Sequence, residues 1–406
     1  MTRKDGSYYG FVYDKIGQLT VASGSVSTER RGYLYDAAWN LHQRTNNGVV
    51  STFNVDSDNQ FITEYCRDAY DSNGNLTSRG ECQAAANYSY DDENRLVSLV
   101  SGTAYRSDFN YDGRSRLRIR TDYTWNGTSW IVSAITRYVY DGNRVIQERN
   151  SSNTPTVAYT RGSDLSGSLE GAGGIGGLLG RSDGYSSGNW TNHNYYHADG
   201  NGNITYMINS SQAMVASYRY DPFGNTISSS GSLSAANVYR FSSKEIHVNS
   251  GMYYYLYRFY DPSLQRWIGK DPIAELGFNF AYGRAALIRL RYVDSLDAWT
   301  PDLNAYAFIL NNPNLYVDPD GANIFQPVCD FFYVTPSALD AQRSYRDALN
   351  RLHSKYGDDL PFELDQYMND WKNDLLREFP KDVATPIIKT VPNTSIHGKP
   401  VVLPKR

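Results

Sequence analysis

The feature that most constrains this chain is a short unit that recurs along it. The unit is Tyr-Asp, two variable residues, Gly or Asn, a polar residue and usually an apolar one. Full copies begin at Tyr13, Tyr35, Tyr70, Tyr90, Tyr111 and Tyr220, and degenerate copies lie at Val55, Tyr140 and Asp199. Successive copies are commonly about 20 to 22 residues apart, a period that is typical of repeat proteins.

The residue types of the unit are those of a hairpin turn. An Asp at the first position of a type I turn accepts hydrogen bonds from backbone N–H groups further along the chain. Gly three residues later supplies a positive φ, and the flanking Tyr and Leu or Ile pack against the next repeat. We therefore expect structural turn roles for Asp14, Asp36, Asp71, Asp91, Asp112 and Asp221. The alternative, a calcium loop over 71–75, lacks an acidic ligand at its far end.

Composition favours strands over helices. The chain holds 35 Tyr and 33 Gly beside many Ser, Asn and Thr, and its first three hundred residues have no long Ala/Leu/Glu/Lys pattern. Aromatic and β-branched residues that are interrupted by Gly, Asn and Asp favour strands and turns. The sequence therefore predicts an all-β fold, an antiparallel array of repeats.

Charge and hydropathy exclude several function classes. The formal net charge is -4 and the Lys and Arg residues are scattered, so we expect the array not to bind nucleic acid. No apolar run is long enough to span a membrane, and residues 1–6 do not lead into a secretory signal. Export is expected to use other information, or a leader that this chain lacks.

Cysteine spacing excludes a zinc site, and we predict no metal and no cofactor. The three cysteines are Cys66, Cys82 and Cys329. Cys66 and Cys82 flank one predicted turn, so they are either a disulfide between adjacent strands or two half-buried thiols. A Gly-x-Gly-x-x-Gly pattern at 171–176 lies in turn-rich β sequence, which indicates a close-approach glycine hairpin rather than a dinucleotide site.

A series of ordered motifs follows the repeats. They span 218–225, 239–245, 251–255, 258–262, 265–273, 304–308, 311–313 and 318–321. This series resembles the RHS repeat-associated core, and the upstream units resemble the YD repeats of the same family. The resemblance covers residues 1 to about 321.

The resemblance implies a partial cocoon or spiral shell. In the family, YD repeats form a hollow β shell around a polymorphic C-terminal toxin, and the core plugs the shell. It implies an array at 1–217, a core at 218–321 and a variable C-terminal segment at 322–406. It also implies an extracellular or cell-surface protein of bacterial competition, whose partners are its own C-terminal segment, secretion machinery and an immunity protein.

The resemblance further implies self-cleavage, which is the most that we predict as enzymatic activity. Many members cut their own chain just after an Asp-Pro-x-Gly-Leu motif, using core aspartates as an acid pair. Asp271 and Asp318 match the Asp-Pro positions, Asp261 and Asp320 are weaker candidates, and Gly321 and Ala322 mark the cleavage region. Two close carboxylates share one proton and serve as acid and base. The alternative is ordinary Asp-Pro turn chemistry.

The sequence departs from the family pattern in three places. Ala322 stands where the family has Leu, and residues 274–303 replace a shorter connection, so we predict slow cleavage or none. The array is also short for a closed shell. The C-terminal segment has helical periodicity near 337–356 and 362–378, which makes it mainly α-helical, with Leu349, Leu352, Trp371 and Leu375 expected to be buried. It carries no ligand or nucleophile pattern that identifies an effector chemistry, and an inert tip is the favoured interpretation.

Two alternative functions remain open. The first is a surface β array that binds carbohydrate or protein, because exposed repeat tyrosines on a rigid sheet would stack on sugar rings. Buried repeat tyrosines would argue against it. The second is a fragment of a larger RHS protein without a function of its own.

Overall fold

The computed structural model describes residues 6–62, 68–80, 85–272 and 304–322. The chain divides into two units, 1–325 and 326–406, and every described residue belongs to the first. Four predictions lie outside the described residues: the Cys66–Cys82 pair, the inserted connection at 274–303, and the helices at 337–356 and 362–378.

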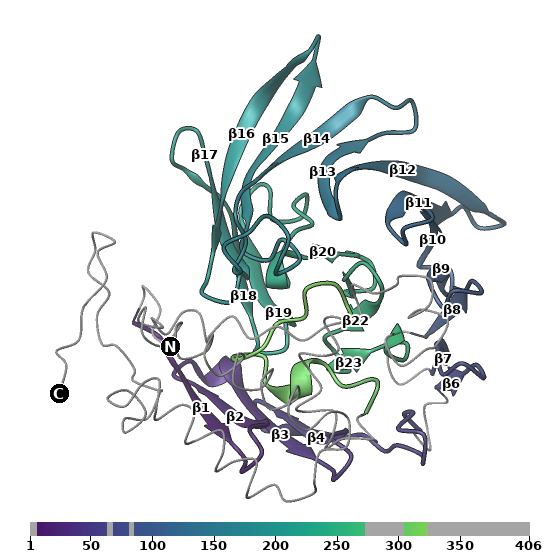
Figure 1. Cartoon of the computed structure of the whole chain (residues 1–406), viewed down its shortest axis with the longest axis vertical. Coiled ribbons are helices and arrows are strands. Elements are labelled where there is room, and N and C mark those ends of the chain that lie inside the picture. Colours follow the sequence, from purple (N-terminus) through teal and green to yellow (C-terminus); the bar gives the residue numbers. More distant parts are fainter. Residues whose placement is uncertain (1–5, 63–67, 81–84, 273–303, 323–406) are drawn as a thin grey trace, which may run out of the picture. The chain divides into compact units, whose positions relative to one another are not determined.

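The described part of the chain is built from antiparallel strands, as the sequence predicted (Figure 1). The first sheet has five strands in chain order. They are β1 (Tyr9–Tyr13), β2 (Leu19–Gly24), β3 (Arg30–Tyr35), β4 (Leu41–Asn46) and β5 (Val49–Thr52). Three short 3-10 turns have described bounds: η1 (Ser27–Glu29), η2 (Phe241–Ser243) and η4 (Ile309–Asn311).

The second sheet has fourteen strands, and each pairs with its neighbours in the sequence. They are β6 (Ala69–Tyr70), β7 (Leu76–Arg79), β8 (Ala86–Tyr90), β9 (Leu96–Ser101), β10 (Tyr105–Tyr111), β11 (Leu117–Trp125), β12 (Trp130–Asp141), β13 (Arg144–Arg149), β14 (Pro155–Arg161), β15 (Leu178–Ser186), β16 (Asn189–Ala198), β17 (Ile204–Asn209), β18 (Met214–Tyr220) and β19 (Thr226–Ser230). This order is a meander, in which short turns join hydrogen-bonded neighbours.

The third sheet belongs to the segment that resembles the core. Its strands are β20 (Glu245–Ile246), β21 (Tyr253–Tyr254), β22 (Phe259–Asp261) and β23 (Arg266–Trp267). Most of this segment is buried, so it packs as an interior rather than as a surface sheet.

The repeat aspartates begin the turns between strands. Asp14 Oδ1 accepts hydrogen bonds from the backbone N–H groups of Ile16 (3.0 Å) and Gln18 (2.9 Å). The same two bonds, from the second and fourth residues after Asp, recur at Asp36, Asp71, Asp91, Asp112 and Asp221. The third residue after Asp has a positive φ in every one of these turns, but it is Gly in only three: Gly17, Gly74 and Gly224, against Trp39, Asn94 and Ser115.

Five of the repeat tyrosines bind their repeat to the one before it. Five tyrosine hydroxyls donate to the backbone carbonyl of the apolar residue that follows the preceding turn. The pairs are Tyr35 to Leu19, Tyr90 to Leu76, Tyr111 to Leu96, Tyr140 to Leu117 and Tyr220 to Ile204, at 2.7 to 3.0 Å. The Tyr position of one repeat and the apolar position of the preceding repeat are therefore hydrogen-bond partners, and this interaction recurs along the array.

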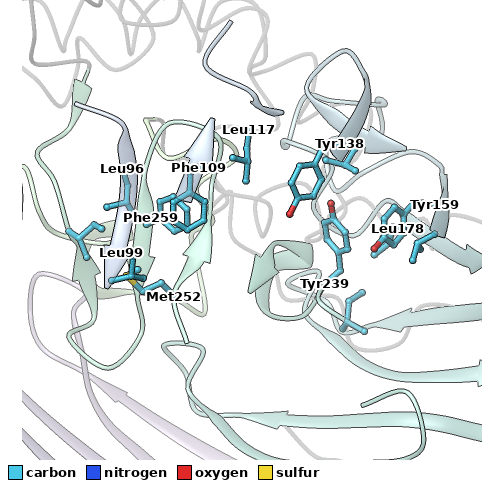
Figure 2. Packing of buried hydrophobic residues seen from close by; sticks show 14 of the residues in the cluster. Leu96, Leu99, Phe109, Leu117, Tyr138, Tyr159, Leu178, Tyr239, Met252 and Phe259 are labelled. Atoms are coloured by element: carbon cyan, nitrogen blue, oxygen red, sulfur yellow. The ribbon is translucent and has the colours of Figure 1, made fainter. Parts of the chain in front are cut away.

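The array packs on the core segment through apolar contacts. Figure 2 shows Phe109 of β10 against Phe259 of β22, with Leu96, Leu99 and Met252 in the same cluster. The ring centroids of Phe109 and Phe259 lie 5.3 Å apart. Apolar area that both segments bury together stabilises each of them.

Polar contacts add to this packing. Arg79 Nη1 of β7 lies 2.8 Å from Asp261 Oδ2, and Asn312 Nδ2 donates to the Gly17 carbonyl at 2.8 Å. The described strands form no closed barrel, because β1–β5 and β6–β19 are separate sheets. Arg219 in β18 and Glu29 beside β3 nevertheless meet in an ion pair at 2.5 Å.

Candidate active site

The candidate site lies where two Asp-Pro segments of the core meet. Asp318 begins a tight turn, and its Oδ1 accepts hydrogen bonds from the N–H groups of Asp320 (3.1 Å) and Gly321 (2.7 Å). Gly321 has a φ of 85°, a conformation that favours glycine. Asp271 follows β23. The Asp318 turn thus resembles the repeat turns in its Asp acceptor and in the Gly of positive φ three residues later. Its second donor, however, is the third rather than the fourth residue after Asp.

One arginine brings Asp271 and Asp318 together. Arg258 Nη2 lies 2.8 Å from Asp271 Oδ2 and 3.6 Å from Asp318 Oδ2. The guanidinium lies over the Trp267 ring, 4.1 Å from its centroid. Its Nε donates to the Gly321 carbonyl, so one side chain contacts both carboxylates and the backbone where cleavage was predicted.

The carboxyl groups of Asp318 and Asp271 differ in their exposure to solvent. Asp318 is 2% exposed, and its burial raises the pKa of the carboxyl to about 7, although Arg258 opposes this effect. The side chain of Asp271 is 31% exposed. A buried carboxyl with a raised pKa beside a partly exposed carboxyl is an arrangement suited to acid–base work on a peptide.

The weaker candidates have other partners. Asp261 Oδ1 accepts the Ser263 N–H at 2.8 Å, and Asp261 Oδ2 pairs with Arg79, so this residue caps a turn and joins the core to the array. Asp320 Oδ1 accepts the N–H of Ala322 at 3.2 Å, and the Asp320 charge helps to raise the pKa of Asp318. Asp320 therefore belongs to the site, as a neighbour of the pair.

Comparisons with known proteins agree on the architecture. No family model matches the chain. A Tc holotoxin pore structure of Photorhabdus luminescens superimposes on 77% of this chain and 15% of its own, with a TM-score of 0.56 and 19% identity. A structure of TcdB2-TccC3 without its hypervariable C-terminal region gives a TM-score of 0.55. The described residues share the fold of the matched part of these Tc toxin chains.

Curated relatives match shorter stretches. The tRNA3(Ser)-specific nuclease WapA of Bacillus spizizenii is 29% identical over 190 residues, which are 46% of this chain and 7% of the nuclease. The uncharacterized protein YibJ of Escherichia coli is 34% identical over 86 residues, 37% of its length. The chain thus spans a small part of the nuclease and of the Tc toxin chains that share its fold.

Two residues of the site escaped sequence reasoning. Arg258 is one residue of the 258–262 motif. Its distance in the sequence from Asp271 and Asp318 does not show that it contacts both of them. Lys244 is buried, and its Nζ donates to the carbonyls of Gly173 (3.0 Å) and Pro319. The only signal for either was a cation inside a strongly aromatic motif, which is a place where a charge needs a partner.

Other features of the described residues bear on the alternative functions. The five repeat tyrosines named above donate their hydroxyls to backbone carbonyls, which leaves these hydroxyls unavailable to a sugar. Tyr13, in the first repeat, is 39% exposed. No cluster of three metal-ligating side chains occurs in the described ranges. Within those same ranges, no helix is long and apolar enough to cross a membrane.

Proposed function

We propose that this chain is the shell-forming part of an RHS-type toxin protein, which cuts itself close after Gly321 and presents the segment that follows. One observation carries the proposal: Arg258 holds Asp271 and Asp318 on the same nitrogen and contacts the Gly321 carbonyl. A structural ion pair alone would not need a second carboxylate and the Gly321 carbonyl on one guanidinium.

The proposed modules are an array at 1–217, a core at 218–321 and a variable segment at 322–406. The burial of core residues against array strands supports a plug-like role for the core. The Tc toxin chain of the same fold carries a C-terminal region that is described as hypervariable, and the Bacillus relative is a tRNA nuclease. We propose a toxin-class effector, released outside the producing cell, and leave its chemistry open.

The proposed reaction is hydrolysis of a peptide bond. Asp271, the solvent-facing carboxylate, accepts a proton from water as the water oxygen attacks the carbonyl carbon. Asp318 donates its proton as the C–N bond breaks, which leaves a new carboxyl and a new amine. Arg258 stabilises the oxygen that gains negative charge, the role of a preorganised donor.

Ala322 bears on the rate. Its side chain is buried, but it is smaller than the Leu that the resemblance places there, so it fixes the scissile region less firmly. We expect cleavage over hours to days rather than during folding.

Gel electrophoresis and size exclusion of the full chain test the proposal. We expect denaturing gels to show the wild type in two pieces that still coelute under native conditions, since a shell retains its cargo. Asp318→Asn should stay in one piece. A wild type that remains in one piece after prolonged incubation overturns self-cleavage, and pieces that separate at once overturn retention.

A further inference from the structure

A buried lysine links the array to the candidate cleavage turn. Lys244 Nζ donates to the carbonyl of Gly173, which lies between β14 and β15 of the array, and to the carbonyl of Pro319 in the turn. The ammonium lies 5.2 Å from the centroid of the Tyr255 ring. A buried ammonium needs hydrogen-bond acceptors in place of water. The two carbonyl oxygens serve as these acceptors, and the ammonium holds both in position.

The glycine-rich segment is held in place before it meets the turn. Asp164 Oδ2 accepts the N–H groups of Ala172 (2.7 Å) and Gly174 (3.0 Å). The N–H of Gly176 donates to Ser243 Oγ at 3.1 Å, next to Lys244. These hydrogen bonds hold the backbone on both sides of Gly173 in position.

Gly173 lies directly against the turn. It has a φ of 61°, and a Cβ at this position would overlap the carbonyl group of Pro319. The absence of a side chain is what lets the array approach the turn so closely. The close approach predicted for the glycine pattern is confirmed at Gly173, which lies against the turn 318–321.

Two further residues of the core, Arg258 and Tyr257, also bind this turn. Arg258 Nε donates to the Gly321 carbonyl, and the N–H of Tyr257 donates to the Asp320 carbonyl at 3.0 Å. The carbonyls of three successive residues are thus bound, Pro319 by Lys244 and the next two by the core backbone and Arg258. The array reaches this turn through Gly173.

We propose that Gly173 and Lys244 are positioning residues that make self-cleavage depend on the docking of the array against the core. The turn 318–321 takes up its cutting geometry only when the glycine-rich segment is seated on it. This inference rests on the proposed self-cleavage. A chain whose array has not folded around the core therefore stays uncut, which prevents early release of the C-terminal segment.

Glycine substitutions in the full chain test the close approach. Gly173→Ala should slow cleavage at least tenfold, because the methyl group displaces Pro319. Gly102→Ala is the matched control: its φ is 49°, so the backbone strain is similar, but a Cβ there meets open space. Equal cleavage rates in the wild type and Gly173→Ala overturn the proposal and leave the cleavage mechanism standing.

Lysine substitutions test the charge. Lys244→Met should slow cleavage and move the alkaline limb of its pH profile upward, because the ammonium no longer favours the ionised form of Asp318. Lys244→Arg should restore part of the rate, and exposed Lys15→Met should change nothing. A Lys244→Met variant that is cut as fast as the wild type contradicts the positioning role.

Hydrogen exchange separates this inference from the proposed function. The Gly321 amide, which is bonded to Asp318, should exchange faster in Gly173→Ala and Lys244→Met than in the wild type, and repeat-turn amides should not. If the wild type is never cut, self-cleavage fails, and faster exchange in both variants still supports the seating of the turn. Unchanged Gly321 exchange in both variants overturns that seating.

Discussion

The hydroxyl of Tyr111 donates a hydrogen bond to the carbonyl of Leu96, 2.7 Å away, across one period of the array. The tyrosine before one turn thereby binds the residue after the previous turn. Arg95 also lies over the Tyr111 ring, 5.1 Å from its centroid, so the repeat stabilises itself on both the polar and aromatic parts of this side chain.

Removal of this hydroxyl should weaken the array. We expect Tyr111→Phe to lower the free energy of unfolding by about 1 kcal/mol, because the Leu96 carbonyl loses its buried donor. Urea denaturation measures the change. Tyr195→Phe is the control, since Tyr195 is 48% exposed, and a loss of equal size there would contradict the ladder.

The turn aspartates can be tested by separating charge from hydrogen bonding. Asp14→Ala should destabilise the chain by about 1 to 2 kcal/mol, because two backbone donors lose their acceptor. Asp14→Asn should be nearly neutral, as the chain itself uses Asn150 with the same two bonds. Equal losses for the two variants would show that the negative charge, rather than acceptance of the bonds, is needed.

Sequence reasoning reached the turns because their chemistry is local. The aspartate, the following N–H groups and the left-handed residue lie within five positions, although the expectation of Gly or Asn at that residue was too narrow, as Trp39 and Ser115 show. The Arg258 link was out of reach, because its partners come from segments whose meeting depends on the packing of the whole core. The position of Gly173 against Pro319 was hidden for the same reason.

Asp261 should behave as a structural residue. We expect Asp261→Asn to lower stability by about 3 kcal/mol, because the Arg79 side chain, which is 10% exposed, loses the carboxylate with which it pairs. The cleavage rate per folded molecule should stay within about twofold of the wild type, as Asp261 pairs with Arg79 and not with Arg258. Denaturation and a cleavage time course measure the two effects, and abolished cleavage in a folded variant would instead place Asp261 in the site.

Cleavage should depend on pH in a defined direction. The pKa of Asp318 is raised from its usual acidic range to about 7, so the carboxyl holds its proton below that pH and loses it above. The rate should therefore fall as pH rises from about 6 to 8, because the acid loses its proton. The stabilising contribution of the neutral carboxyl is lost over a lower range, as pH rises from the ordinary carboxyl pKa of 3.8 to about 7. A rate that increases through this range would assign the acid to another group.

The mass of the purified full chain tests the central claim most directly. Wild type incubated for days near pH 6 should yield an N-terminal fragment that ends at Gly321 or Ala322, together with its complementary C-terminal piece. Asp271→Asn and Asp318→Asn should remain intact, while Asp58→Asn, at an exposed turn position, should be cut like the wild type. An intact wild type, or cutting at an unchanged rate in both site variants, would contradict the account.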